Sequence, residues 1–530
     1  MSASADSRVW FLLERRQRWA YVVGLIAIAV VARLPQLLSP NLLLTGDEAV
    51  LGLMAKHVAQ GKELPMFFYG QHYGFTLIEE LVGALSFTLF GVGAIPLKLA
   101  ILAVWIVGIV FVFLALARLI GDARSLWITS FLVLSPVWAV PSMNAWGGYQ
   151  TAFTASAILW WMLAQERSLD TTAQWVLAGL LTSLIYFAQR LWLPGVLPFV
   201  AAALVTRRRW LMPLLAYLVM TAAPILLLEL TVSRANDVWG TPSLGNSYFL
   251  GALPYVGQQI YLNFTGAYYL SQPLDPPGPV TRIMADLWCG LLVFAVSMQV
   301  YRLATKRYLR WSHLFFASVV LTLGGEWLLL FGRSAHYLLP LSAPLILLVG
   351  IELADLMDRR VLPKSVVLGF AVASVMLGSV SMYEFRAFNF LWPNPPASMS
   401  EAKRLQRVFA YLKTQDVHHV FSMNGLLDTQ LIFYSDEQVI ARWTDPVERY
   451  QAYVREVDRA LAQGERVAVV GYTDTSGAPG CVDVPICTGD ISHRVANPEA
   501  IYTVDGKYFV YVGADRKLLE QLRFRFWETN

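Results

Sequence analysis

The sequence predicts a mainly α-helical protein that crosses a membrane many times and ends in a small α/β domain. Hydrophobic residues make up 56% of its 530 residues and charged residues only 15%, and the mean hydropathy is +0.50. A soluble globule of this size needs more polar surface than that. From about Pro395 the composition becomes that of a soluble domain. We therefore expect a membrane domain over residues 1–394 and an α/β domain over residues 395–530.

Apolar runs account for the membrane domain. A spanning helix needs about 20 apolar residues. Eleven runs qualify, some only just: 19–38, 96–117, 125–143, 149–165, 173–189, 191–206, 211–231, 284–301, 311–331, 336–357 and 364–384. No small-residue cleavage site follows the first run, so we expect a retained anchor rather than a signal peptide.

A further apolar run, Phe75 to Phe90, is short and contains Glu79 and Glu80. If it does not span, the basic clusters RRR, RLATKRYLR and DRR all fall on the cytoplasmic side; if it spans, they all face outward. Cytoplasmic loops carry the excess of Lys and Arg, so the first arrangement is favoured. We therefore expect eleven spans, a cytoplasmic N-terminus and an extracytoplasmic α/β domain.

This topology leaves two large outer loops, residues 39–95 and about 232–281. In the first loop we expect two helices lying along the membrane surface. Ala49 to Gln60 follows a candidate cap at Asp47 and has one broad apolar side, formed by Val50, Leu51, Leu53, Met54 and Val58. The run from Phe75 to Phe90 is expected to be the second, deeper helix.

The C-terminal domain alternates strand and helix patterns. HHVFSM, EQVIARW and ERVAVVGY indicate short strands, MNGLLDTQLIFY and PVERYQAYVREVDRALAQ indicate helices, and IYTVDGKYFVYV indicates a hairpin turning at Asp505 and Gly506. It has no phosphate-binding Gly loop, metal-ligand cluster or nucleophile motif. We expect a structural or acceptor-guiding role for it.

The sequence has three cysteines, and two of them indicate the compartment in which the C-terminal domain lies. Cys289 lies in an apolar segment and is expected to be inert, whereas Cys481 and Cys487 lie close together in the polar part as CVDVPIC. A disulfide between Cys481 and Cys487 is favoured over two free thiols, and it would place the C-terminal domain in an oxidising compartment.

Polar residues gather in three groups at the expected outer face. The first is Asp47 and Glu48 with the aromatic segment FFYGQHYGF, which contains Tyr69, Gln71, His72 and Tyr73. The second is MNAWGGYQT, with Asn144 and Tyr149, together with Arg190 on the next outer turn. The third is GRSAHY, with Arg333, His336 and Tyr337.

These groups have an ordinary and a functional interpretation. A carboxylate pair after a helix is commonly a solvated cap, and an Arg at a membrane border commonly reaches toward lipid phosphates. Here, however, outer charges are scarce and lie beside aromatic and Gly-rich segments. A carboxylate next to an apolar cavity can act as a general base, and Arg offers a planar fork for phosphate. Together they indicate chemistry on a lipid phosphate.

The order of these features resembles a known family. GDEAVLGLMAKHVAQGKELPMFFYGQHYG after the first span, then a hydrophobic stretch ending FGVGAIPLKLA, and later GRSAHYLLPLSAPLILL, are similar to the membrane glycosyltransferases of the C-type fold. That group contains the protein O-mannosyltransferases and the aminoarabinose transferase of lipid A. The resemblance covers most of residues 15–385 in layout, with specific motifs near 40–120 and 325–350.

The resemblance implies an inverting transfer of a hexosyl or pentosyl group from a polyprenyl-phosphate donor to a cell-envelope acceptor. Asp47 corresponds to the base that deprotonates the acceptor hydroxyl, with Glu48 in support. Arg333 and Tyr337 correspond to residues that bind the departing phosphate. No metal or other cofactor is expected if Arg or Lys supplies the positive charge.

The same comparison narrows the activity. The aminoarabinose transferase has an Arg shortly after its DE pair, where this sequence has AVL. It also has an EKPP motif later in the loop, where this sequence has GQHYGFTLIEEL. The HPP motif of the mannosyltransferases is absent as well. Neither specific activity is predicted, so the acceptor stays open among lipid, glycan and protein. The implied location is a bacterial inner membrane, with membrane lipids as partners and no nucleic acid.

Two other classes of function compete with the enzyme. A lipid-linked-sugar flippase or other transporter would concentrate charged or helix-breaking residues at the membrane midplane and often shows repeated halves. Here the polar groups lie at the outer border and no internal repeat is present. An assembly protein that binds a partner through its C-terminal domain would leave the DE pair unexplained.

Overall fold

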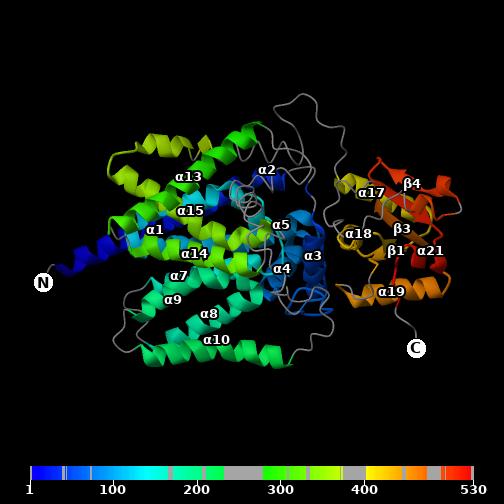
Figure 1. Ribbon diagram of the computed structural model, residues 1–530, viewed down its shortest axis with the longest axis horizontal. Helices are drawn as coiled ribbons and strands as arrows, with labels where there is room; N and C mark the ends of the chain where they lie inside the picture. Colours follow the sequence, from blue (N-terminus) through cyan, green and yellow to red (C-terminus); the bar gives the residue numbers. More distant parts are fainter. Residues whose placement is uncertain are drawn as a thin grey trace.

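The protein is a helical bundle with a smaller α/β domain at one end (Figure 1). The computed structural model describes residues 3–38, 42, 44–71, 74–164, 171–205, 210–231, 279–306, 310–329, 335–370, 372–373, 401–444, 449–473, 491–495 and 497–526. The expected second outer loop, most of the run 364–384, and both Cys481 and Cys487 fall outside these residues, so those predictions are untested. Cys289 is a half-buried free thiol.

The bundle helices coincide with the apolar runs of the sequence. They are α1 (Ala3–Val31), α5 (Ala94–Ile120), α6 (Asp122–Leu134), α7 (Tyr149–Leu163), α8 (Thr172–Gln189), α9 (Leu193–Val205), α10 (Leu211–Thr231), α13 (Pro279–Ala304), α14 (Arg310–Leu329) and α15 (Leu339–Asp358). Among the described residues, five stretches are long and apolar enough to cross a membrane: Ala94–Ile120, Thr172–Val205, Leu211–Leu230, Asp286–Ala304 and Leu339–Asp358. A mainly helical membrane fold is confirmed, whereas the number of spans stays a prediction.

One helix is shorter than predicted. The apolar run 125–143 gives α6 only as far as Leu134, followed by the short 3-10 turns η1 (Pro136–Trp138) and η2 (Pro141–Met143). Proline lacks the N–H that would continue a helix, so Pro136 and Pro141 begin turns instead. The segment after η2 can therefore approach the neighbouring helix ends.

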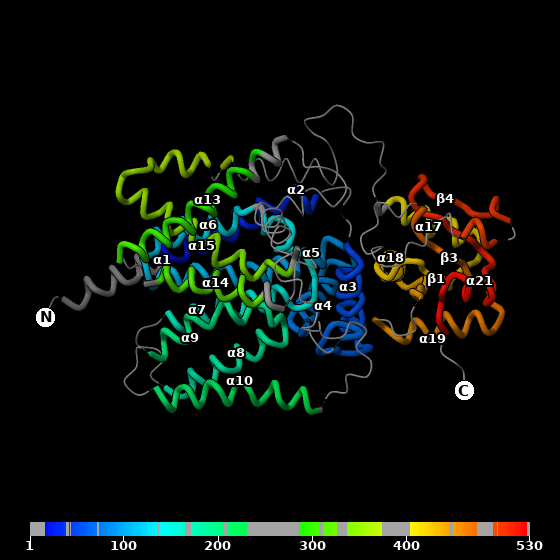
Figure 2. Tube along the Cα trace, viewed as in Figure 1, coloured from blue at the N-terminus to red at the C-terminus, as the bar shows by residue number. Residues whose placement is uncertain are grey.

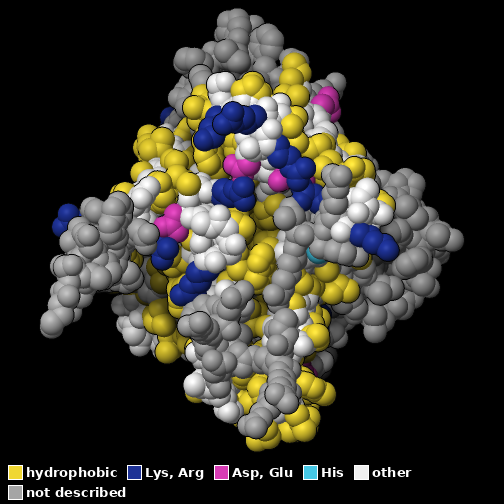
Figure 3. Space-filling view, turned by 90° about the vertical axis from the view of Figure 1, so that its left-hand side faces the viewer, with side chains coloured by type: hydrophobic (Ala, Val, Ile, Leu, Met, Phe, Trp, Pro, Cys, Tyr) yellow, Lys and Arg dark blue, Asp and Glu magenta, His cyan; other side chains and the backbone are white. Residues whose placement is uncertain are grey.

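Basic residues gather at the end of the bundle away from the α/β domain (Figure 3). Arg18 of α1 pairs with Asp122 of α6 at 3.0 Å, and Arg124 pairs with Asp358 at the end of α15. Arg302 of α13 lies 2.9 Å from Asp355 of α15. The helix ends predicted to face the cytoplasm thus lie together at one end of the bundle.

The first loop contains the two predicted helices at the opposite end, α3 (Gly46–Ala59) and α4 (Leu77–Phe90) (Figure 2). The predicted cap at Asp47 is wrong, because the helix is capped by Thr45 and Asp47 lies inside its first turn. Both faces of α3 are buried: it packs on α4 on one side and on α18 (Leu427–Tyr434) of the α/β domain on the other.

The C-terminal domain has the strands and helices that its pattern predicted. Its sheet has the order β2-β1-β3-β5-β4, with β2 (Ile440–Arg442), β1 (His419–Ser422) and β3 (Val467–Tyr472) parallel, and β5 (Tyr508–Val512) and β4 (Tyr502–Val504) forming an antiparallel hairpin. The remaining helices are α17 (Glu401–Thr414), α19 (Gln451–Ala462) and α21 (Arg516–Gln521). α18 and the segment that leads into α19 face the bundle.

Candidate functional site

The first turn of α3 is held by reciprocal hydrogen bonds. The Glu48 amide donates to Thr45 Oγ1 at 3.4 Å, and the Thr45 amide donates to Glu48 Oε2 at 2.9 Å. This is the capping box that the sequence T-x-x-E specifies. Asp47, between the two capping residues in sequence, takes no part in it and projects from another side of the helix.

Glu48 is buried and ion-paired. Its side chain is 1% exposed and accepts a hydrogen bond from Lys98 Nζ of α5, which is equally buried. Lys98 Nζ also donates to Asn144 Oδ1 at 2.6 Å, and the Ala145 amide donates to Glu48 Oε1 at 3.3 Å. Glu48 therefore fastens α3 to α5 and to the segment after η2. Lys98 was not among the predicted site residues.

Asp47 has different surroundings. Its side chain is 38% exposed, and its Oδ1 lies 2.8 Å from Nη2 of Arg449 in the C-terminal domain. The Arg449 guanidinium carbon lies 4.7 Å from the centre of the Phe68 ring. Asp47 and Arg449 are 402 positions apart in sequence, so no local pattern could have revealed the pair.

The aromatic segment after α3 folds back on itself in a tight loop. Phe67 and Phe75 form a β-bridge, and the Phe68 amide donates to the Gly74 carbonyl at 3.1 Å. Tyr69 is buried and Gln71 is half-buried in this loop. His72 and Tyr73 lie outside the described residues.

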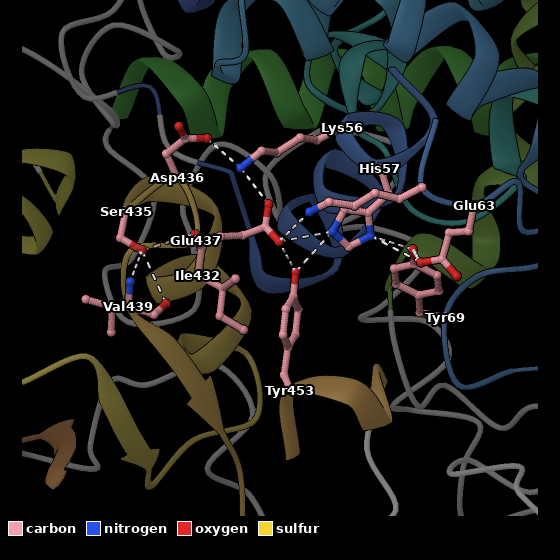
Figure 4. A network of polar contacts seen from close by, with 11 residues as sticks. Lys56, His57, Glu63, Tyr69, Ile432, Ser435, Asp436, Glu437, Val439 and Tyr453 are labelled. Carbon is pink, nitrogen blue, oxygen red and sulfur yellow. Dashed lines mark hydrogen bonds and ion pairs between the residues drawn. The ribbon is translucent and has the colours of Figure 1, made fainter. Parts of the chain in front are cut away.

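Tyr69 belongs to a polar network between α3 and the C-terminal domain (Figure 4). Its hydroxyl donates to Glu63 and lies 2.8 Å from His57 Nδ1. His57 Nε2 lies 3.2 Å from Glu437 Oε1, which also accepts a hydrogen bond from the Tyr453 hydroxyl at 2.9 Å. The network joins the two parts of the protein.

Lys56 also belongs to this network and is one of three groups that lower the pKa of Glu437. Lys56 Nζ lies 2.6 Å from Glu437 Oε2 and 2.5 Å from Asp436 Oδ1. Burial alone would raise the pKa of Glu437, but hydrogen bonds from His57, Lys56 and Tyr453 outweigh burial and hold that pKa well below its ordinary value. Glu437 is therefore ionised at neutral pH.

The second predicted group meets the first. The Phe75 amide donates to the Phe187 carbonyl of α8 at 2.9 Å, and a Cβ on Gly148 would lie 2.9 Å from the Phe75 carbonyl and 2.5 Å from that of Ala188. These contacts bring the segment 144–151, the aromatic loop and the end of α8 together.

Individual residues of this group differ in exposure. Tyr149 is buried at the start of α7, and Asn144 is buried against Lys98. Arg190, in the 3-10 turn η4 (Arg190–Trp192), is exposed at the same end of the bundle. Of these three side chains, only that of Arg190 is exposed.

Glu79 and Glu80 have structural partners. The Glu79 carboxylate accepts hydrogen bonds from the amides of Gly148, Gln150 and Thr151, at 3.2, 3.2 and 3.1 Å. These amides belong to the beginning of α7, where unpaired N–H groups favour a carboxylate. Glu80 accepts a hydrogen bond from the Thr76 hydroxyl. Glu79 thus orients the segment 144–151.

The third group is only partly described. Tyr337 is half-buried in η6 (Ala335–Leu338), and His336 lies in the same turn, although nothing is described of its side chain. Arg333 lies outside the described residues.

Comparisons with known proteins identify the fold. No protein-family model matches the chain, and no curated protein matches it in sequence. The chain is similar to ArnT from Cupriavidus metallidurans bound to undecaprenyl phosphate, with a TM-score of 0.51 and 15% identity over 94% of this chain and 99% of that one. A likeness to the archaeal oligosaccharyltransferase AglB from Archaeoglobus fulgidus, in complex with an inhibitory peptide and a dolichol-phosphate, has a TM-score of 0.46 and 12% identity over 87% and 70% of the chains.

The ArnT comparison shows a common fold along almost the whole chain, as the sequence resemblance predicted. At 15% identity this likeness shows the fold alone.

Proposed function

We propose that this protein is an inverting membrane glycosyltransferase that takes a sugar from a polyprenyl-phosphate donor. The observation that carries the proposal is the difference between two adjacent acids. Glu48 is buried and ion-paired with Lys98, whereas Asp47 is 38% exposed at the same helix start. Asp47 can therefore meet a substrate hydroxyl, and Glu48 keeps the helix start in place.

The proposed reaction uses Asp47 as the base. The acceptor hydroxyl oxygen forms a bond to the anomeric carbon of the sugar while its proton passes to Asp47. The bond between that carbon and the phosphate oxygen breaks, and polyprenyl phosphate leaves with the bonding electrons. Attack from the face opposite the phosphate inverts the configuration. A positioned general base is worth about 10²–10⁴-fold in rate.

The leaving phosphate needs positive charge and hydrogen-bond donors. We assign this role to Arg333 and Tyr337 on the strength of the sequence resemblance, and Arg190 is a further cation exposed at the same end of the bundle. Tyr69 and Asn144 are engaged in internal contacts, so we assign them to shaping the site rather than to gripping the sugar.

The compartment is part of the proposal. The basic end of the bundle is assigned to the cytoplasm, and α3 and the C-terminal domain to the outer face of a bacterial inner membrane. The acceptor is then a lipid, glycan or protein of the cell envelope. The ArnT structure with undecaprenyl phosphate makes a lipid of that class the first donor carrier to test.

Asp47→Asn tests the base. The variant keeps the shape of the side chain but removes its basicity, so we expect transfer to fall about 10²–10⁴-fold with lipid binding unchanged. The purified protein is assayed with radiolabelled undecaprenyl-phosphate sugars and membrane extract as the acceptor source. Binding of unlabelled undecaprenyl phosphate is measured in parallel.

Glu456→Gln is the matched control, because Glu456 is an acid of α19 whose side chain is 49% exposed and whose carboxylate lies 3.6 Å from His419 of β1. Its transfer rate should equal that of the wild type. Full transfer by the Asp47→Asn protein would refute the base assignment. If the wild-type protein instead moves labelled lipid-linked sugar across liposome membranes without transferring it, the protein is a transporter.

A further inference from the structure

The C-terminal domain supplies a residue to the proposed reaction site. Arg449 precedes α19 and places its Nη2 2.8 Å from Asp47 Oδ1. Within the described part of the chain, Asp47 Oδ2 accepts no hydrogen bond. We propose that Arg449 is a positioning residue that holds one oxygen of the base so that the other faces the acceptor hydroxyl. The inference rests on the proposed function.

Arg449 is itself held in place. Its side chain is 12% exposed, and its guanidinium carbon lies 4.7 Å from the centre of the Phe68 ring. A cation over an aromatic face is favoured, and it limits the rotamers of a long side chain. The next residue, Tyr450, stacks on Tyr69 with ring centres 4.7 Å apart. Two consecutive residues are thus fixed to the aromatic loop that follows α3.

A carboxylate base benefits from such a partner. An aspartate side chain rotates about two bonds, and a third group commonly orients the base of a catalytic pair. An end-on contact from one guanidinium nitrogen restrains Asp47 and leaves its second oxygen open. The acceptor hydroxyl approaches the base from the side away from the leaving phosphate. Arg449 therefore belongs to the acceptor half of the site.

Hydrogen bonds between α18 and the residues before Asp47 hold the C-terminal domain where Arg449 reaches Asp47. The Thr429 hydroxyl of α18 donates to the Gly46 carbonyl at 3.0 Å, and Gln430 Nε2 donates to the Leu44 carbonyl at 2.7 Å. The Leu44 amide donates to the Tyr434 hydroxyl at 2.8 Å. These bonds join α18 to the residues just before Asp47, so the C-terminal domain contacts Asp47 and the backbone that carries it.

Arg449→Ala and Arg449→Lys are compared with Arg455→Ala, an exposed arginine of α19. We expect Arg449→Ala to lower kcat about 10–100-fold, a loss of the size found when a group that orients a metal ligand is removed. Donor KM and undecaprenyl phosphate binding should remain within about twofold, since the proposal places Arg449 behind the base and assigns it no contact with the donor. Arg449→Lys, which keeps the charge but loses the fork, should be intermediate.

Chemical rescue separates positioning from folding. Methylguanidinium added to the Arg449→Ala protein should restore part of kcat, and it should leave the Arg455→Ala protein unchanged. A kcat equal to that of the wild type in both Arg449 variants would overturn the inference, as would a loss confined to donor KM. If Arg449→Ala lowers the unfolding temperature, the kcat of the Arg449→Lys protein is the test. An intermediate kcat supports the positioning role, and a kcat equal to that of the wild type overturns it.

The two proposals fail differently. If Asp47→Asn transfers sugar at the full rate, the base assignment fails, whatever Arg449 does. If Asp47→Asn is inactive while both Arg449 variants match the wild type in kcat, the proposed function stands and only the role of Arg449 is wrong.

Discussion

At the scale of single residues, helix geometry separates two acids that are neighbours in sequence. Successive residues of an α-helix point about 100° apart. Glu48 therefore faces the bundle and pairs with Lys98, while Asp47 faces the C-terminal domain and pairs with Arg449. The two carboxylates serve different purposes because of this rotation, although both are acids at the start of the same helix.

Lys98→Met tests the buried pair. It leaves the Glu48 carboxylate buried without its cation, and breaking a buried pair costs about 3–5 kcal/mol. We expect a loss of stability of that size in denaturant unfolding in detergent. Lys62→Met, which removes a lysine that is 49% exposed, should cost no more than about 1 kcal/mol.

Replacing both members of the pair sharpens this test. In the Glu48→Gln, Lys98→Met double variant no buried charge is left unpaired, so part of the lost stability should return. A double variant that is less stable than Lys98→Met would contradict the account of Glu48 and Lys98 as a mutually neutralising pair.

The site residues were predictable to different degrees. Asp47 and Glu48 were identified because they are charges beside an apolar run, and the T-x-x-E pattern that fixes Thr45 as the cap is also visible in the sequence. Lys98 could have been noticed as a charge near the beginning of an apolar helix. Arg449 could not, since only tertiary folding brings it to Asp47.

At the scale of elements, α3 is enclosed on both sides. It was predicted to be an amphipathic helix with one broad apolar side on the membrane surface, but its apolar residues are divided between two sides, and Val50 and Leu53 line a pocket with residues of the C-terminal domain. This second side is covered by α18, and two glycines allow the close approach. A Cβ on Gly46 would lie 2.6 Å from Leu426 Cα, and one on Gly52 would lie 2.6 Å from the Phe433 ring.

Gly46→Ala is expected to disturb this contact. In an isolated helix the change would be favourable by about 1 kcal/mol, but here the new methyl group meets the backbone of Leu426. Overpacking of this kind typically costs about 1–3 kcal/mol. Thermal unfolding in detergent measures the loss, and transfer should fall with it because Arg449 is displaced.

Gly24→Ala provides the comparison, since a Cβ on Gly24 of α1 would have no atom within 4 Å. It should be neutral or slightly stabilising. Equal stability of the Gly46→Ala and wild-type proteins would mean that α18 does not press on α3 as described.

At the scale of the whole molecule, the bundle and the C-terminal domain are joined by charge. Glu437 lies among Lys56, His57, Lys62 and the Tyr453 hydroxyl. Because its pKa is lowered on folding, its contribution to stability is complete above its ordinary pKa of 4.5 and is lost as the pH falls below that value.

Glu437→Gln should therefore flatten the acid limb of the stability curve. The wild-type protein is expected to lose more stability than the variant as the pH falls from about 5 to about 3, as followed by unfolding temperature in detergent. At neutral pH the variant should be the less stable of the two. If the unfolding temperatures of the two proteins fall in parallel over this pH range, Glu437 is not the source of the acid-induced loss of stability.

The architecture was largely predictable, and its assembly was not. Apolar runs and strand patterns located the helices of the bundle and the elements of the C-terminal sheet, because burial and periodicity are local signals. The prolines after Leu134 shortened one predicted helix, for a reason that is also local. How α18 meets α3 depends on shape and charge matching between distant segments, which a single sequence does not display.

The covering of α3 by α18 also has a consequence for biosynthesis. α3 ends at residue 59, but the residues that cover its second side begin at 426. Chains are made from the N-terminus and domains fold as units. The apolar flank of α3 must therefore stay uncovered, or be sheltered by a chaperone, until the last quarter of the chain has been translated. A partly made or truncated chain then has an incomplete candidate site, so we expect the proposed sugar transfer to begin only when synthesis is finished.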